Sequence, residues 1–527
     1  MEVYPGSGLS IPQLLQALEK AVGHSLTEAR RTTFNMYETK WRQVEVLESF
    51  NGMKALVNEL SPINCLPPEV LSAIPTYWSA DSQGDLIRAT HVCRYWRTTL
   101  TASPSLWNDI KSGNEARMRA CIHRSQSYPL SVEIKHPGQE GVLSDAVLFR
   151  LKSLTLSLPV TNLTKPLGRL ISPTPMLEEV SITLADSGDY LPVIKTGDFF
   201  MLSKLHLDGV HANFACLPAP HLMILHLENL QNNPRMPDLL QFLNSTPWLE
   251  RMVLVNSGPE GDREPSEQVV RLMSLRALTL RGTVAKAKLL QHLAIPASAD
   301  IDLVGRFNQR LDGVMEEFLP PCLDNLPVTS NFTSLSITST SRSSCDINLS
   351  GNQGKLSVTV KNEHHRGMLG HGPLRPPTAN LCLQRLTPLV LDTVTHLTIR
   401  RDPWGQQAFP EISAFREFLH QLPSLQSIDL VHCDFNSIHA LNPVGVNLPF
   451  FRFLSIYVAP DAKVQLDLLS HLAKSKALVQ CPLERVKFVF GSAARVMFSD
   501  SEMNGLKEHV QMVEVEAVDG NNVTGGL

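Results

Sequence analysis

The sequence predicts an α/β protein in which an N-terminal helical segment and a short three-helix module precede a long, irregular repeat solenoid. Two observations carry this prediction. Apolar residues recur at helical spacings of three and four up to about residue 110. From residue 151 to residue 280, short apolar triplets recur instead at intervals of 20 to 27 residues, a spacing that is typical of stacked repeat units.

Composition excludes several classes of protein. The 527 residues include 47 Lys and Arg against 51 Asp and Glu, and the net charge of −4 offers no electrostatic footprint for nucleic acid or anionic lipid. The first ten residues lack the basic region and apolar core of a secretory signal, and no apolar run is long enough to span a bilayer. The nine scattered cysteines form no Cys-x-x-Cys pair, which favours reduced thiols. We therefore expect a cytoplasmic or nuclear protein that binds neither nucleic acid nor membrane.

Residues 1–60 are predicted to form an N-terminal helical segment. One helix is expected over 11–22, and a second opens with Ser25-Leu-Thr-Glu28, which has the pattern of a capping box. The second helix carries an aromatic and apolar stripe of Phe34, Tyr37, Trp41 and Val44. This stripe is explained either by a short coiled-coil seam or by packing against the next domain.

Residues 61–110 are predicted to form a compact helical module. A first helix follows Asn64, with Leu66, Val70 and Ile74 on one side, and Pro75 should truncate or kink it. A second helix is expected from Asp85 through Arg97. Its apolar stripe consists of Ala89, Val92, Cys93, Trp96 and Leu100. Ser103-Pro104 then has the pattern of a helix start, and Trp107 is the expected buried anchor.

This module resembles the F-box family, whose pattern is Leu-Pro-x-Glu, a helix, Val-Cys-Arg-x-Trp and a closing Leu-Trp. The matching residues are Leu66, Pro67, Glu69, Val70, Leu71, Ile74, Leu86, Val92, Cys93, Arg94, Trp96, Arg97, Leu100, Leu106 and Trp107. The resemblance implies that part of the apolar surface docks onto the Skp-type adaptor of a cullin–RING ubiquitin ligase. The expected adaptor-binding residues are Leu66, Pro67, Ile74, Val92 and Trp96, some of which would instead be internal core.

A linker helix is expected over 111–129, a solenoid over 130–515 and a disordered tail over 516–527. In the solenoid an apolar residue, two others, an apolar residue, one other and an apolar residue recur, starting with Leu151/Leu154/Leu156, Leu177/Val180/Ile182, Leu202/Leu205/Leu207, Leu222/Leu225/Leu227, Leu249/Met252/Leu254 and Leu275/Leu278/Leu280. Further copies are expected at Phe332/Leu335/Ile337, Val394/Leu397/Ile399, Leu425/Ile428/Leu430, Phe451/Leu454/Ile456 and Leu483/Val486/Phe488. The pattern and its period resemble irregular leucine-rich repeats.

Such repeats stack because no single unit can bury its apolar face alone. The expected result is a parallel sheet on the concave face and helices on the convex face, with helical segments at 238–243 and 415–422. The asparagine or cysteine that the repeat family places three residues after the last leucine appears as Cys433 but is mostly absent. The interval from 280 to 337 should hide degenerate repeats or insertions, and residues 361–380 and 258–267 should be exposed loops.

Side chains between and just after the strand leucines should face the concave surface and bind a target protein. They are His206, Asp208, His226, Glu228, Arg281, Arg400, Asp429 and Tyr457, although any one of them could be an ordinary solvated side chain. Their mixed charges suit protein recognition better than binding of a polyanion.

The sequence offers no catalytic centre and predicts no metal or cofactor. His364, His365 and His371 lack the cysteines or the helical spacing of a metal motif. Neither a phosphate-binding loop nor a Gly-x-Ser-x-Gly elbow is present. The first hypothesis is a non-catalytic substrate receptor of a Skp–cullin–F-box ubiquitin ligase. The alternatives are a non-ligase interaction scaffold, which Pro75 favours, and an enzyme with an unrecognised site, which no motif supports.

Overall fold

The computed structural model of the chain consists of two compact units, residues 1–151 and residues 152–527. It describes Gln16, Glu19, Lys20, His24 and residues 36–518 except 79–82, 171–173, 187–192, 195–198, 215–216, 218, 231, 260–267, 284–285, 307–317, 342–343, 362–381, 384–385, 387–388, 390, 402–409, 444–445, 447, 459–463 and 492–499. Within this part of the chain, no helix combines the length and the apolar character that crossing a membrane requires.

The first unit begins with the long helix α2 (Met36–Glu59). Trp41 and Val44 are 74% and 54% exposed, so neither is buried against the described part of the chain. The coiled-coil interpretation of their stripe stays a prediction. Phe34 and most of the helix expected over 11–22 lie outside the described residues.

The helical module follows as η1 (Pro62–Cys65), α3 (Pro68–Ala73), η2 (Ile74–Tyr77), α4 (Gln83–Ala89), α5 (Arg94–Thr101) and η3 (Pro104–Trp107). The prediction for Pro75 is confirmed, because α3 ends at Ala73 and the chain continues as a short 3-10 helix that contains the proline. α3 and α4 both pack against α5. The core they share is closed by Leu71, Leu86, Leu100 and Trp107, all at most 5% exposed.

The prediction of one continuous helix from Asp85 through Arg97 is wrong. α4 ends at Ala89, and residues 90–93 form a turn before α5. The turn is stabilised by local side-chain bonds, since the Thr90 hydroxyl donates to the Ile87 carbonyl and the Arg97 guanidinium donates to the Thr90 carbonyl. Cys93 is extended (φ −153°) and begins α5. The apolar stripe is therefore split between two helices and the turn that joins them.

The rest of the first unit connects the module to its first strands. β1 (Asp109–Ile110) pairs in parallel with β2 (Leu130–Ile134), and α6 (Glu115–Arg124) lies between them in the chain. α6 confirms a helix within 111–129, and the Asn114 side chain caps it by accepting from the Ala116 N–H at 2.8 Å. η4 (Glu140–Val142) and α7 (Asp145–Leu148) complete the unit.

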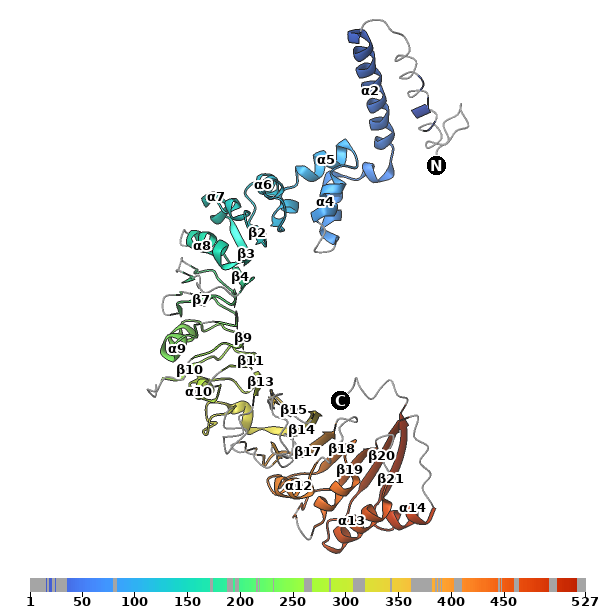
Figure 1. Cartoon of the computed structure of the whole chain (residues 1–527). Coiled ribbons are helices and arrows are strands. Elements are labelled where there is room, and N and C mark those ends of the chain that lie inside the picture. The colour runs from blue at the N-terminus through green and yellow to red at the C-terminus, as the bar shows by residue number, and fades with distance from the viewer. Residues whose placement is uncertain are drawn as a thin grey trace, which may run out of the picture. The chain divides into compact units, whose positions relative to one another are not determined.

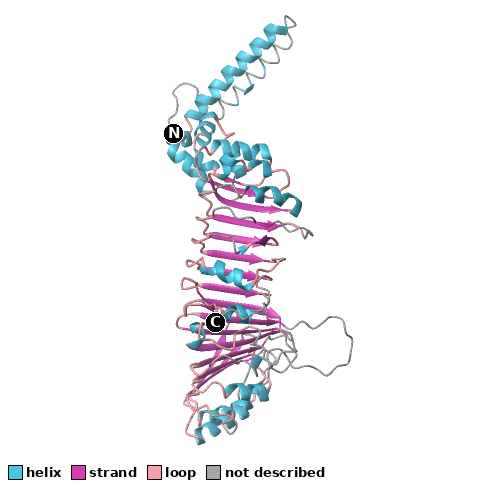
Figure 2. Ribbon diagram, turned by 90° about the vertical axis from the view of Figure 1, so that its left-hand side faces the viewer, coloured by secondary structure: helices cyan, strands magenta, loops and turns pink. Residues whose placement is uncertain are grey.

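The second unit is built on one long, mostly parallel sheet, whose strands lie side by side like rungs (Figure 2). Its first strands are β3 (Leu151–Leu158), β4 (Glu179–Leu184), β6 (Lys204–Asp208), β8 (Ile224–Glu228), β9 (Arg251–Val255) and β11 (Ala277–Arg281). Corresponding apolar residues are register partners from strand to strand, as in the row Leu154, Val180, Leu205, Leu225, Met252 and Leu278. The predicted strand positions are confirmed, and the repeats stack in the expected order.

Residues 332–361 contain the one departure from parallel order among the described strands of this sheet. β13 (Asp300–Arg306) extends the parallel array and was not predicted. The next three strands, β14 (Phe332–Ser341), β15 (Ser344–Gly351) and β16 (Lys355–Lys361), form an antiparallel meander. β16 pairs with β13, and β14 pairs with β17 (His396–Arg401), so the spatial order is β13–β16–β15–β14–β17. The expectation of a wholly parallel sheet is corrected, since β15 runs against all the others.

The array then continues in parallel through β18 (Ser427–Val431), β19 (Phe453–Val458), β20 (Arg485–Gly491) and β21 (Met512–Val518). The helices α8 (Val160–Arg169), α9 (Met236–Asn244), α10 (Lys286–Gln291), α12 (Ile412–Leu419), α13 (Leu466–Leu478) and α14 (Asp500–Lys507) follow individual strands. In Figure 1 they lie along one side of the strands.

The two faces of the sheet differ. The buried leucines of the strands form the core between the sheet and these helices. Alternate side chains point to the opposite face of the sheet, which we call the polar face.

Shorter elements join these strands and helices. β5 (Val193–Ile194) pairs with β7 (His211–Ala212), and β10 (Val270–Arg271) pairs with β12 (Leu293–Ala294), each as a separate two-stranded sheet. The 3-10 helices η7 (Pro327–Ser330) and η8 (Phe435–Leu441) occupy two further connections.

A left-handed turn residue follows several strands of the sheet. Gly209, Asn229, Asn256 and Gly282 have φ values of +71°, +49°, +47° and +60°. Each lies two residues after the last leucine of its strand, so the asparagine position is one residue earlier than the sequence pattern led us to expect. Asn256 Nδ2 donates to Asn229 Oδ1 at 2.9 Å and links adjacent turns. Glycine and asparagine occur here because they adopt a positive φ at low cost.

Replacement of Gly209 by alanine is expected to lower the free energy of unfolding of the second unit by about 1–2 kcal/mol, because φ is positive there. A Cβ would also lie 2.9 Å from the Cβ of Leu184, which is too close. Denaturant unfolding measures the change. Gly168→Ala in α8 is the matched control, since open space surrounds that position and the helix should gain about 0.5–1 kcal/mol. Equal effects of the two substitutions would contradict the strain argument.

Candidate functional site

The helical module presents apolar side chains that its own core does not use. Val70 on α3 is 47% exposed, Tyr77 at the end of η2 is 89% exposed, and Val92 in the turn before α5 is 61% exposed. Ile63 on η1 is 44% exposed. Exposed apolar side chains on a small rigid module can supply contact area for a protein partner.

The five predicted adaptor-binding residues lie at different depths in this module. Pro67 and Val92 are exposed, and Leu66 and Ile74 are half-buried. Trp96 is only 8% exposed, and its indole N–H donates to Asn64 Oδ1 at 2.7 Å. Its ring therefore belongs mainly to the core of the module.

Two side-chain hydrogen bonds attach the first turn of the module to α5. One is the bond from Trp96 to Asn64, and the other runs from the Tyr95 hydroxyl to the Leu66 carbonyl at 2.7 Å. They fix Leu66 and Pro67 against the helix that begins just after Val92. Trp96 thus positions part of the exposed surface, while Val92 forms part of it.

Sequence reasoning missed Ile63 and Tyr77 as candidate contact residues. Neither occupies a position of the resemblance pattern, and helical periodicity does not distinguish an exposed apolar side chain from a buried one. For α3 a signal was present, because Leu71 fills the core and its neighbour Val70 must then point elsewhere.

The polar face of the second unit carries the other candidate residues. Two parallel rows cross it, one through the residues between the strand leucines and one through the residues just after them. His206 on β6 is opposite His226 on β8, and two residues further along Asp208 is opposite Glu228. Arg281 lies on β11, and Arg400, Asp429 and Tyr457 lie on β17, β18 and β19. All eight predicted residues are therefore on strands, in the expected rows.

Seven of these eight residues fall into two groups, four on β6 and β8 and three on β17, β18 and β19. Seven strand-to-strand steps separate β8 from β17 in the sheet, which corresponds to roughly 30 Å at the usual strand spacing. Arg281 lies between the groups and forms an ion pair of 3.0 Å with Asp302 on β13. One small ligand cannot contact both groups, whereas an extended protein surface can.

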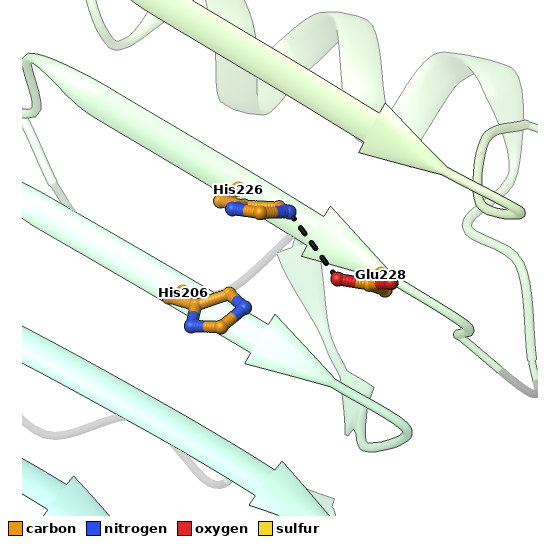
Figure 3. Close-up of side chains that lie close together, drawn as sticks. All are labelled: His206, His226 and Glu228. Carbon is orange, nitrogen blue, oxygen red and sulfur yellow. Dashed lines mark ion pairs between the residues drawn. The ribbon is translucent and has the colours of Figure 1, made fainter. Parts of the chain in front are cut away.

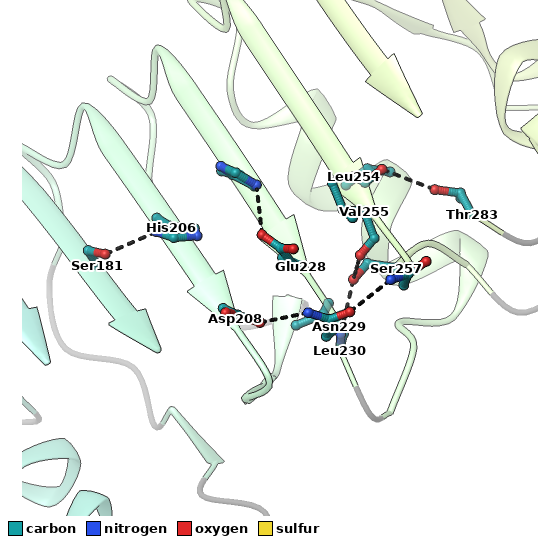
Figure 4. Close-up of polar contacts among 12 residues, drawn as sticks. Ser181, His206, Asp208, Glu228, Asn229, Leu230, Leu254, Val255, Ser257 and Thr283 are labelled. Atoms are coloured by element: carbon teal, nitrogen blue, oxygen red, sulfur yellow. Dashed lines mark hydrogen bonds and ion pairs between the residues drawn. The ribbon is translucent and has the colours of Figure 1, made fainter. Parts of the chain in front are cut away.

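The group on β6 and β8 borders a shallow depression of about 250 Å³ on the polar face. Residues of β3, β4, β6 and β8 line it, among them Thr155, Ser181, His206 and His226. Figure 4 shows the polar contacts of this region, in which Ser181 Oγ lies 3.0 Å from His206 Nδ1 and Asn229 Nδ2 donates to Asp208 Oδ1 at 3.0 Å. Burial lowers the pKa of His206, and the neighbouring His226 lowers it further.

The group on β17–β19 centres on a buried carboxylate. Asp429 is 8% exposed, and its Oδ2 lies 3.2 Å from Nε2 of His396, the first residue of β17. His396 also bonds Ser427 through Nδ1. The hydrogen bond to Asp429 raises the pKa of His396, although burial opposes it. Burial raises the pKa of Tyr457, and the charge of Asp429 adds to that effect. His396 was not among the predicted residues.

The imidazole of His396 should titrate above the usual histidine pKa of about 6.5. Asp429→Asn removes the carboxylate and should lower that pKa. Because the folded pKa is raised, the ion pair contributes stability that is fully present below about pH 6.5 and is lost as the pH rises through the folded value. NMR titration of labelled histidine rings measures both effects. Asp392→Asn, at an exposed position just before β17, should leave the His396 titration unchanged. An unchanged titration in Asp429→Asn would refute the pairing.

Comparisons with known proteins agree with the family resemblance that the sequence of the helical module indicates. Residues 63–111 match the family model described as F-box-like. No curated protein matches the chain. Among solved structures, a chain in the crystal structure of the Rad7 and Elc1 complex in yeast is similar to this one, with 12% sequence identity and a TM-score of 0.25 over 88% of this chain and 96% of that chain.

The fold and the module together define a class of protein. The chain joins a small helical module to a mixed α/β, solenoid-like array with a large, mostly parallel sheet. The module is an F-box-like domain at residues 63–111.

Proposed function

We propose that this chain is a substrate receptor of a Skp–cullin–F-box type ubiquitin ligase. The F-box-like domain binds a Skp-type adaptor, and the polar face of the repeat array binds a target protein. The chain itself makes and breaks no bond, and it promotes ubiquitin transfer by holding the target near the ubiquitin-loaded enzyme. We assign the array to the irregular leucine-rich repeats, because strands that share one apolar triplet recur with the period of that family.

One observation carries the adaptor assignment. The segment that matches the F-box-like family folds as a module whose core is closed by Leu71, Leu100 and Trp107, yet Val70 and Val92 remain about half exposed or more. An apolar side chain that is exposed to water and is not required for the core can be buried favourably in the interface with a partner protein.

The polar face supports a protein target in preference to a small substrate. Its charged side chains occur in pairs of opposite sign, such as Lys204 with Glu179, Arg281 with Asp302 and Lys487 with Glu516. Such mixed charge gives electrostatic complementarity to a protein surface and no uniform field for a polyanion. No disulfide joins the eight described cysteines, in keeping with a cytoplasmic or nuclear location.

The adaptor assignment is tested by co-purification of the full chain with a Skp-type adaptor. Val70→Asp combined with Val92→Asp should reduce adaptor affinity at least tenfold, because two carboxylates would be buried without partners at the contact. Val44→Asp on α2 is the matched control, since this valine is 54% exposed and lies outside the F-box-like domain. Equal affinity of the double variant and the control, or no binding by the wild type, would overturn the assignment.

The alternative function is an interaction scaffold outside any ligase, and the shortened helix before Pro75 is the observation that favours it. Reconstitution with adaptor, cullin and ubiquitin-loading enzyme discriminates the two. Ubiquitin transfer to a protein captured on the repeat array supports the receptor. Adaptor binding without transfer to any captured protein supports the scaffold.

A further inference from the structure

Two histidines and one glutamate converge on the polar face of the second unit. His206 on β6 and His226 on β8 are register partners, and their ring centroids lie 4.4 Å apart. Glu228 follows His226 by two residues on the same strand, and successive side chains of a strand alternate between faces, so its carboxylate lies on the same face. Figure 3 shows the three side chains gathered over these two strands.

Their donor atoms lie close to the arrangement that a metal ion requires. One ligand atom of each residue can be chosen so that all three lie within 4.8 Å of one another. His226 Nε2 and Glu228 Oε2 are already 3.5 Å apart. Tetrahedral zinc with bonds of about 2.0–2.1 Å places neighbouring donors roughly 3.4 Å apart. The widest pair of donor atoms must therefore approach by at most about 1.4 Å, since 4.8 Å less 3.4 Å is 1.4 Å.

The two imidazoles also have nitrogen atoms that lack a hydrogen bond. His206 Nε2 and His226 Nε2 are shielded from solvent, and neither has a hydrogen-bond partner among the described residues, although His226 Nε2 lies 3.5 Å from the Glu228 carboxylate. A shielded polar atom without a hydrogen bond is unusual in a folded protein and calls for a ligand or an ion.

The surroundings are compatible with the tautomer that metal binding needs. Ser181 Oγ lies 3.0 Å from His206 Nδ1, so the hydroxyl can accept a hydrogen bond from Nδ1–H in the tautomer whose Nε2 lone pair is free. Metal-binding histidines in proteins are oriented by a second hydrogen bond of this kind. Asp208, the register partner of Glu228, is held by Asn229 at 3.0 Å and adds a second negative charge nearby.

We propose that His206, His226 and Glu228 bind a divalent transition-metal ion, and that zinc suits the donor set best. Two imidazole nitrogens and one carboxylate are ligands that zinc favours, whereas calcium and magnesium favour sites built from oxygen alone. Three protein ligands leave a fourth position for water. Both histidines also line the depression on the polar face, which gives the ion access to solvent.

The test is metal binding by the full chain, after removal of any affinity tag and treatment with a chelator. Cobalt serves as a spectroscopic probe, and zinc is then added to displace it. We expect one equivalent of tightly bound cobalt that zinc displaces. His226→Gln and Glu228→Gln should each weaken zinc binding at least tenfold, and the double variant His206→Gln, His226→Gln should lose it.

His221→Gln is the matched control, because this histidine is exposed in the turn just before β8 and should bind as the wild type does. Thermal unfolding supplies a second measurement. Zinc should raise the midpoint of the wild type and of His221→Gln but not of Glu228→Gln, while the metal-free midpoints of all three agree. Equal zinc affinity in the wild type and in the double variant would assign the metal to other groups and overturn the proposal, as would failure of the wild type to bind.

Discussion

Replacement of Trp107 by alanine is expected to lower the free energy of unfolding of the first unit by about 3–5 kcal/mol. The side chain is fully buried, and its indole N–H donates to the Leu100 carbonyl at 2.8 Å. The Arg124 guanidinium stacks on the ring at 4.4 Å, so the indole also connects η3 to α6. Truncation would leave a large cavity and remove the indole hydrogen bond in the smaller of the two units. Denaturant unfolding followed by far-ultraviolet circular dichroism measures the loss.

Trp41→Ala provides the control, because it makes the same substitution at a tryptophan that is 74% exposed in the same unit. We expect that variant to stay within about 0.5 kcal/mol of the wild type. The Trp107 variant should also lose adaptor binding, since the surface that carries Val70 and Val92 depends on the module being folded. A stability change as small as that of Trp41→Ala would show that Trp107 does not hold the module together.

The second large effect concerns Lys476 on α13, a lysine that is 1% exposed. Its Nζ donates to the Leu448 carbonyl at 2.9 Å and lies 5.0 Å from the centroid of the Phe451 ring. Burial lowers the pKa of this ammonium group from 10.5 to about 8. Between those two values the unfolded chain binds a proton that the folded chain has lost, so stability rises with pH across this window. At about 1.4 kcal/mol per pKa unit the gain is roughly 3 kcal/mol.

Lys476→Met should abolish this contribution while keeping most of the buried volume. As the pH rises from 7.5 to 10.5, the unfolding free energy of the wild type should therefore increase by roughly 3 kcal/mol relative to that of Lys476→Met. Other groups that titrate in this range cancel in the difference. Lys474→Met, at an exposed position on the same helix, should show no such shift. A pH-independent difference for Lys476→Met would mean that the buried amine keeps its proton throughout.

The strands of the solenoid-like unit were predictable from the sequence because each is specified locally. An apolar triplet with the spacing of Leu205 and Leu207 can bury its side chains on one side of a strand only, and the strand must then lie against its neighbours. Helical spacing likewise indicated the F-box-like segment, since Leu66, Val70 and Ile74, and further on Trp96 and Leu100, recur at intervals of four. Pro75 acts through its own ring and missing N–H, and its effect on α3 was therefore also predictable.

The order of the strands between β13 and β17 was decided only by tertiary structure. β14, β15 and β16 have the same alternation as the parallel strands, and nothing local in that alternation tells which partner each will choose. Partner choice depends on pairing between residues far apart in the chain, as when Ile301 meets Leu356. The break between α4 and α5 could not be predicted from apolar periodicity. The side-chain hydrogen bonds of the Thr90 turn compete with helix propagation, but the spacing of the apolar residues continues unchanged through the turn.

The sequence by itself therefore determined the two kinds of architecture, the F-box-like segment and the rows on which the polar-face residues lie, because each follows from side-chain periodicity along a short stretch of chain. Only the tertiary structure decided that seven of the eight predicted target-binding residues form two separate groups, with Arg281 between them. It also decided that Trp96 is core while Val92 is surface, and that His206 meets His226 from 20 positions away in the chain. Register between strands sets these distances, and register is fixed by the packing of the whole array.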